Sequence, residues 1–220
     1  MADALSAETR LAAPVEGARA AAVGVAWAIR VVRTATAIAE LHRLGLGEAA
    51  SPMVRSVMEH AVSMLWLVER RDEAVKAIEY AHRRHQRLLR DSALGHGWDL
   101  SDLDGEMATA PLDLAMVKPE EWPRMKAFEQ RMTDPTVRSW YPAYRVESGT
   151  SHASYLSGAV YVREDGGFQW EGAVPPTSLR ATAVFAVIAL QALLELVTPP
   201  ARLLAAVEQS RALLGMASSE

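Results

Sequence analysis

Apolar residues recur every three or four positions through most of this chain, which is the period of an amphipathic α-helix. The pattern predicts helices over residues 14–43, 52–70, 72–94, 177–197 and 201–216. The ends of these segments carry suitable residues. Pro14 suits the first turn of a helix, Gly45 follows the first segment, and Pro199 and Pro200 follow the fourth.

Two parts of the chain depart from the helical period. Residues 97–118 are acidic and irregular, which predicts a long loop, and a short helix is expected after Pro119. Apolar and polar residues alternate over 159–163 and 167–171, on either side of Asp165–Gly166, a dipeptide typical of hairpin turns. The fold class that we predict is therefore all-α, an up-and-down bundle of four to five long helices with a small β-hairpin insertion at about 159–171.

Length and composition indicate a single helical domain over residues 1–220, with its packed part at about 14–215. Half of the residues are apolar and 23% are charged, which is ordinary for a globular protein and unlike a disordered one. The predicted core brings together apolar residues from three helices, namely Val57, Leu65, Ile78, Leu88, Phe185 and Leu193.

Composition also excludes several functional classes. The chain has no Cys, so disulfides, thiolate metal sites and Cys nucleophiles are excluded. The first ten residues lack the basic and apolar parts of a signal peptide, and we expect a cytoplasmic protein. Residues 181–197 are apolar but shorter than the roughly 20 residues of a membrane span, so we expect a buried core helix and no membrane association. A net charge of −4 argues against binding nucleic acid through overall charge.

Arg55 and Glu59 are four residues apart on the second helix and therefore share a face with the apolar Val62 and Trp66. One interpretation is an intrahelical ion pair, which contributes about 0.2–0.5 kcal/mol when exposed. The other is a partly buried site, because a charge pair among apolar residues needs further polar neighbours. We predict that Arg55 and Glu59 approach Ser148 or His152.

The third helix carries a stripe of three arginines, Arg83, Arg87 and Arg90. It is typical of a solvated helix face and is also suited to holding phosphates. Glu79 and His82 have the Glu-x-x-His spacing of helical di-metal sites, but no second copy of that motif exists. We therefore expect no metal and no cofactor.

The stretch from Tyr144 to Tyr155, YRVESGTSHASY, is rich in small and polar residues. Gly149 and the adjacent hydroxyl residues disfavour a helix interior, so we predict that a helix breaks or begins near Gly149 and turns Ser148 and His152 inward. Six residues separate Arg145 from His152. A bend at Gly149 would bring these two side chains to one place.

The Arg-x(4–6)-His spacing characterises the HEPN superfamily of helical bundles. In addition, an Arg-x-x-x-Glu helix followed by Tyr-Arg and Ser-x-x-x-His-Ala resembles an uncharacterised bacterial family of helical proteins, known as a domain of unknown function. That family in turn resembles the HEPN superfamily. The resemblance covers about residues 50–215. The residues that carry it are Arg55, Glu59, Tyr144, Arg145, Ser148, His152 and Ala153.

The resemblance implies a homodimeric, metal-independent endoribonuclease that acts on RNA. In such a protein His152 would move a proton of the 2′-hydroxyl or the leaving group, and Arg145 would stabilise charge on the phosphate. Ser148 and Tyr144 would complete the site, Arg55 and Glu59 would orient it, and the arginine stripe would hold the strand.

The alternative is a non-catalytic helical module that binds a small molecule or a partner protein. Arg55, Glu59, Ser148 and His152 would then form a buried polar cluster. A nuclease requires a positive groove at His152, whereas a binding module requires a closed and largely apolar pocket.

Overall fold

The structure is a computed structural model that describes residues 2–6, 11–100, 113–133, 135–152, 155–159, 161–169 and 178–216. Within these ranges every regular element is a helix, so the predicted all-α class is confirmed. The α-helices are α1 (Ala2–Ser6), α2 (Ala18–Arg43), α3 (Ser51–Gly95), α4 (Trp122–Lys126), α5 (Pro135–Arg138), α6 (Tyr141–Thr150), α7 (Tyr155–Ala159), α8 (Ser178–Leu196) and α9 (Ala201–Leu214). Short 3₁₀ helices are η1 (Gly47–Ala50), η2 (Leu114–Met116), η3 (Pro119–Glu121) and η4 (Phe128–Arg131).

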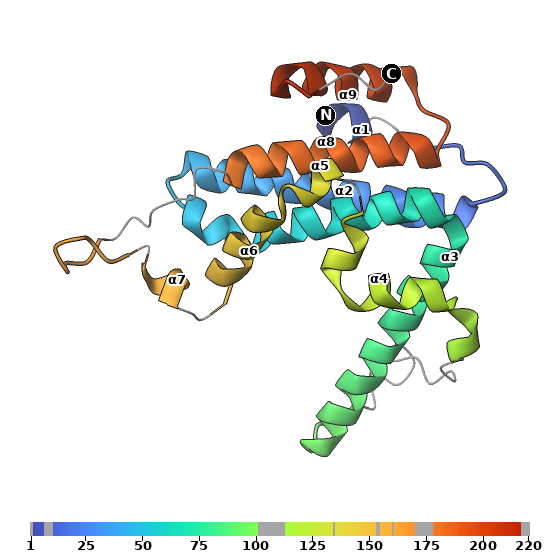
Figure 1. The fold of residues 1–220 in the computed structure, drawn as a ribbon, viewed down its shortest axis with the longest axis horizontal. Helices are drawn as coiled ribbons and strands as arrows, with labels where there is room; N and C mark the ends of the chain where they lie inside the picture. Colours follow the sequence, from blue (N-terminus) through green and yellow to red (C-terminus); the bar gives the residue numbers. More distant parts are fainter. Residues whose placement is uncertain are drawn as a thin grey trace.

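The core lies between α2, the first half of α3 and α8, and Figure 1 shows these helices side by side. The apolar stripes that predicted the helices face one another here. Val57, Phe185 and Leu193 are fully buried, and Leu65 and Ile78 pack against the core while half-buried. α1 and α9 contact each other beyond α8, and α6 packs against α3 and α8. This arrangement places α6 beside the face of α3 that carries Arg55 and Glu59.

α3 is broken at Arg71, which confirms the predicted boundary between residues 70 and 72. Arg71 has φ 47° and ψ −128°, a conformation that is costly for a residue with a Cβ. Its side chain donates from Nη1 to the carbonyl of Glu195, at 3.0 Å, in the last turn of α8. Next to it, the Asp72 carboxylate accepts the backbone N–H of Ala20 near the start of α2.

These contacts also define the directions of the core helices. The break in α3 and the last turn of α8 meet at the first two turns of α2. Leu196 Cδ1 lies there, 2.6 Å from the position that a Cβ on Gly24 would occupy. α8 is therefore parallel to the first half of α3, and both are antiparallel to α2. The bundle is not a simple up-and-down series, because α8 is parallel to the first half of α3, the core helix that precedes it in the chain.

The second half of α3 leaves the core and projects away from it (Figure 1). Leu88, which we predicted in the core, is 53% exposed there, so that prediction is wrong. The helical period is present at Leu88, but within the described residues no element covers this part of the helix. A period identifies which side chains share a face and does not identify what that face contacts.

The predicted β-hairpin insertion is not supported, because the described residues contain no strand. A single antiparallel bridge joins Val162 to Phe168 across a turn in which Gly166 has φ 82°. The predicted first strand fails at its start, since residues 155–159 form α7. Phe168 is 83% exposed, so the turn buries no apolar face that could extend the pairing. Residues 160, 170 and 171 of the prediction lie outside the described residues.

Two helices, α2 and α8, are long and apolar enough to cross a membrane by length and composition alone. α8 contains the segment that we predicted to be a buried core helix, and Phe185, Leu190 and Leu193 within it are fully buried. Residues 101–112, which form most of the predicted acidic loop, lie outside the described residues.

Candidate functional site

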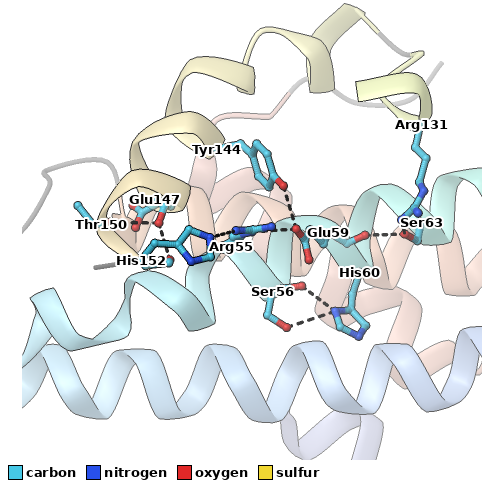
Figure 2. A network of polar contacts seen from close by, with 11 residues as sticks. Arg55, Ser56, Glu59, His60, Ser63, Arg131, Tyr144, Glu147, Thr150 and His152 are labelled. Atoms are coloured by element: carbon cyan, nitrogen blue, oxygen red, sulfur yellow. Dashed lines mark hydrogen bonds and ion pairs between the residues drawn. The ribbon is translucent and has the colours of Figure 1, made fainter. Parts of the chain in front are cut away.

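Arg55, Glu59, Tyr144 and His152 form a polar cluster between α3 and the end of α6. Arg55 donates from Nε to Glu59 Oε1 at 2.9 Å, and its Nη1 lies 3.0 Å from His152 Nε2. Figure 2 shows the Arg55 side chain lying between Glu59 and His152. The contact joins residues that are 97 positions apart in the sequence. The prediction that Arg55 approaches His152 is therefore confirmed.

The contact defines the hydrogen-bonding role of His152. A guanidinium has only N–H donors, so the Nε2 atom of His152 must accept the hydrogen bond from Arg55. The tautomer that accepts this hydrogen bond carries its proton on Nδ1. The hydrogen bond to Glu59 raises the pKa of Arg55, so the arginine stays charged. His152 is exposed and the Arg55 side chain is 28% exposed, so the pair is open to solvent.

Tyr144 also donates a hydrogen bond to Glu59. Its hydroxyl donates to Glu59 Oε1 at 2.9 Å, the same oxygen that accepts from Arg55. Burial raises the pKa of Tyr144, and the hydrogen bond to Glu59 raises it further, which keeps the phenol protonated. The Arg55 guanidinium lies 5.5 Å from the centre of the Tyr144 ring, and that ring stacks on Phe128 at 4.1 Å. Arg55 is thus fixed by a carboxylate and by an aromatic face.

α6 ends immediately before His152. The Thr150 hydroxyl donates to the carbonyls of Val146 and Glu147, and the Ser151 hydroxyl donates to the carbonyl of Glu147. Such side-chain bonds to the backbone accompany the end of a helix. The predicted break near Gly149 is confirmed, with the last helical residue at Thr150.

The predicted inward turn is confirmed for one of the two residues. Ser148 is half-buried and its hydroxyl oxygen is buried. His152 faces Arg55 but remains exposed, so it is not turned into the bundle. Since the helix ends before His152, the side chain lies at the edge of the packed surface. Ala153 lies outside the described residues.

Glu147 belongs to the same region and was not predicted. It is 1% exposed, and Oε1 accepts a hydrogen bond from the Ser178 hydroxyl at 2.6 Å, which ties α6 to the first residue of α8. A glutamate in a polar stretch is normally a surface residue. Its burial could have been predicted from its position, three residues after the buried Tyr144 and on the same face of the helix.

Arg145 is not part of the cluster. Among the described residues no contact joins Arg145 to His152, and Arg145 is exposed. It lies instead near Glu129 and Tyr141. The Tyr141 hydroxyl, which donates to Glu129, holds the pKa of that carboxyl below its usual range, and Arg145 adds to this effect. A bend near Gly149 is present, but Arg55 occupies the place at His152 that we had assigned to Arg145.

The arginine stripe also lies apart from the cluster. Arg83, Arg87 and Arg90 are on the projecting half of α3, after the break at Arg71 (Figure 1). Arg87 is exposed and the other two are half-buried. The break directs them away from the first half of the helix, which carries Arg55.

A pocket of about 200 Å³ lies on the other side of Glu59. It sits where the two halves of α3 meet α2 and α4, and its walls include Trp27, His60, Ser63, Trp66, Met125 and Arg131. No pattern in the sequence predicts this pocket. Its residues come from separate elements, and only the break in α3 brings them together.

His60 lies between the pocket and α2. Its Nδ1 donates to the carbonyl of Ser56 at 2.7 Å, and its ring meets the edge of Trp27 with a centroid distance of 5.8 Å. Burial lowers the pKa of His60 below its ordinary value of 6.5, because the charged imidazolium is poorly solvated there. The imidazole is therefore neutral in the folded protein near pH 7.

This pKa predicts a pH dependence of stability. Below about pH 6.5 the unfolded chain binds a proton at His60 that the folded protein does not, so the free energy of unfolding falls as the pH falls. The slope from one such group approaches about 1.4 kcal/mol per pH unit and ends at the folded pKa. Denaturant unfolding between pH 7 and 5 measures it. His60→Asn should flatten the curve, whereas His85→Asn, at an exposed position, should not. Equal curves for His60→Asn and the native chain would contradict this.

The comparisons with known proteins place the chain in a family. A family of unknown function (DUF5677) matches residues 21–169. The matched residues include Arg55, Glu59, Tyr144 and His152, whereas α8 lies beyond them. No curated protein and no solved structure matches the chain. Because the match covers more than half of the 220 residues, the chain belongs to the family of unknown function DUF5677.

Proposed function

We propose that the protein cleaves RNA at the Arg55–His152 pair, in a HEPN-like reaction that needs no metal. The observation that carries the proposal is the 3.0 Å contact between Arg55 Nη1 and His152 Nε2. It joins a guanidinium, which stabilises charge on a phosphate, to an imidazole, the side chain that most often serves as a general base. Both groups reach solvent, as a polymeric substrate requires.

In the absence of substrate, the lone pair of His152 Nε2 is occupied by Arg55. A phosphate that approaches Arg55 offers a charged acceptor, which forms a stronger hydrogen bond than a neutral imidazole. Arg55 would then turn toward the phosphate and release Nε2 as a general base. The same movement would stabilise the phosphate and activate His152.

The bond changes follow from this arrangement. His152 Nε2 takes the proton of the 2′-hydroxyl, the 2′-oxygen bonds to phosphorus, and the bond from phosphorus to the 5′-oxygen breaks. The leaving oxygen takes a proton from water, and His152 later returns its own proton to solvent. The products are a 2′,3′-cyclic phosphate and a 5′-hydroxyl end. Arg55 stabilises the negative charge that builds on the phosphate oxygens.

Glu59 and Tyr144 would act as positioning residues in this reaction. Glu59 holds Arg55 Nε, so that the terminal nitrogens Nη1 and Nη2 are the ones presented to a phosphate, and Tyr144 fixes Glu59 from α6. Arg145 lies beside Glu129 and takes no part in this scheme. The role that the HEPN resemblance assigned to Arg145 passes to Arg55.

The test is an incubation with mixed single-stranded RNA in the presence of EDTA. We expect the native chain to cleave RNA and His152→Ala to lose at least about 100-fold in rate, which is the usual contribution of a general base. His85→Ala, an exposed histidine on the projecting half of α3, is the matched control and should retain full activity. Thermal unfolding of each variant excludes a loss of fold.

A second substrate sharpens the test. RNA with a single 2′-deoxy position should resist cleavage at that position, and the fragments should carry cyclic phosphate ends. Equal cleavage by the native chain and His152→Ala, or fragments with 5′-phosphate ends, would contradict the proposal. No cleavage of any RNA by the native chain would contradict it as well.

A further inference from the structure

The pocket beside Glu59 is a second candidate site, separate from the Arg55–His152 pair. It lies inside the angle between the two halves of α3, whereas His152 lies at the end of α6. Figure 2 shows His60 and Arg55 pointing in different directions from α3, with Arg131 approaching Ser63 further along the helix. The two sites share only the Glu59 side chain, so a ligand in one need not touch the other.

Arg131 is a half-buried charged side chain in the wall of this pocket. It donates from Nε to the carbonyl of Arg124 at 2.6 Å, from Nη1 to the Ser63 hydroxyl at 2.9 Å and from Nη2 to the carbonyl of Met125 at 3.3 Å. These three bonds use three of the five N–H donors of the guanidinium and leave two. All three acceptors are uncharged.

The charge of Arg131 is only partly compensated, by the nearby Glu59. Among the described residues no carboxylate forms an ion pair with it, and burial lowers its pKa despite the nearby Glu59. Glu59 is already occupied by Arg55 and by the Tyr144 hydroxyl. A partly buried cation held only by neutral acceptors favours an anion that brings its own charge into the pocket.

The aromatic walls and the volume of the pocket indicate which kind of molecule carries the anionic group. Trp66 is 2% exposed and forms the floor, with the Arg131 guanidinium 5.5 Å from its ring centre. Trp27 is half-buried and contributes an aromatic side chain from α2. The volume of about 200 Å³ exceeds the roughly 150 Å³ of an apolar cavity that holds one benzene. It suits one ring with a small charged group.

We propose that this pocket binds a small aromatic carboxylate, with the carboxylate on Arg131 and the ring against Trp27. The two remaining N–H donors of Arg131 match the two oxygens of a carboxylate. The site is independent of the RNA-cleaving activity proposed above, because neither Arg131 nor Trp27 touches His152.

The test uses benzoate as the probe and measures its dissociation constant by calorimetry, with benzyl alcohol and acetate as matched probes. Benzyl alcohol retains the ring and lacks the charge, whereas acetate retains the charge and lacks the ring. We expect saturable binding of benzoate, and binding at least about tenfold weaker for each of the other two. Equal affinity for benzoate and acetate, or no saturable binding of benzoate, would overturn the proposal.

Two variants locate the site. Trp27→Ala should weaken benzoate binding at least about tenfold, whereas Trp98→Ala, which removes a tryptophan that is 69% exposed, should leave it unchanged. Arg131→Lys keeps the positive charge and loses the fork, and should also weaken binding. If Arg131→Lys unfolds the chain, Trp27→Ala still shows whether benzoate binds in this pocket, because Trp27 takes no part in the hydrogen bonds of Arg131.

The same experiment separates this proposal from the proposed function. His152→Ala should bind benzoate as the native chain does, and Trp27→Ala should cleave RNA as the native chain does. A loss of benzoate binding in His152→Ala would show that the probe occupies the Arg55–His152 pair and would overturn the assignment to this pocket. A native chain that binds benzoate but cleaves no RNA would leave this proposal standing without the other.

Discussion

Replacing Phe185 with Ala should lower the free energy of unfolding by about 3–5 kcal/mol, the range for removing a large aromatic side chain from a packed core. Phe185 is fully buried on α8, and its ring meets the edge of Trp140 with a centroid distance of 5.9 Å. The substitution removes the buried apolar surface and leaves a cavity between α8 and the segment before α6. Urea or guanidinium unfolding measures the loss.

The matched control is Phe168→Ala, since Phe168 is 83% exposed. That variant should change stability by less than about 0.5 kcal/mol, as surface substitutions usually do. The two variants remove the same atoms, so the difference between them reports burial alone. A loss of less than about 1 kcal/mol for Phe185→Ala would contradict the core described above.

Replacing Glu121 with Ala should cost about 3 kcal/mol, which is large for a glutamate in a mostly polar segment. Glu121 is 1% exposed and ends η3. Its Oε2 accepts the indole N–H of Trp66 at 2.6 Å, and its Oε1 accepts from Arg70. Without Glu121 the buried indole N–H has no acceptor, and a buried donor without a partner costs more than the hydrogen bond contributed.

Glu120→Ala is the matched control for this prediction. Glu120 also pairs with Arg70, at 3.2 Å, but its side chain is 55% exposed. An exposed ion pair contributes little, so the control should be close to neutral. The Trp66→Phe substitution removes the N–H donor, and the loss caused by Glu121→Ala should be smaller in that background. Equal losses for Glu120→Ala and Glu121→Ala would show that the Trp66 hydrogen bond is unimportant.

The local pattern of residues was sufficient to predict the long helices and the break in α3. Apolar side chains at intervals of three and four give a helix one face to bury, and this property depends only on neighbours in sequence. Phe185 in the core could be predicted for the same reason. The end of α6 could be predicted from Gly149 and the adjacent hydroxyl residues, which are also a local property of the sequence. The contact between Arg55 and His152 was also expected, because a charge pair on a partly apolar face requires polar neighbours.

The tertiary structure decided which elements meet, and therefore which residues form the sites. Leu88 has the helical period but no covering element among the described residues, and the turn at Gly166 has no buried face to become a hairpin. Arg55 rather than Arg145 contacts His152, and Glu121 becomes a buried acceptor for Trp66. Each of these outcomes depends on the packing of segments that are far apart in the chain. Sequence spacing specifies directions around one helix, whereas contacts between helices depend on how all of their faces are buried together.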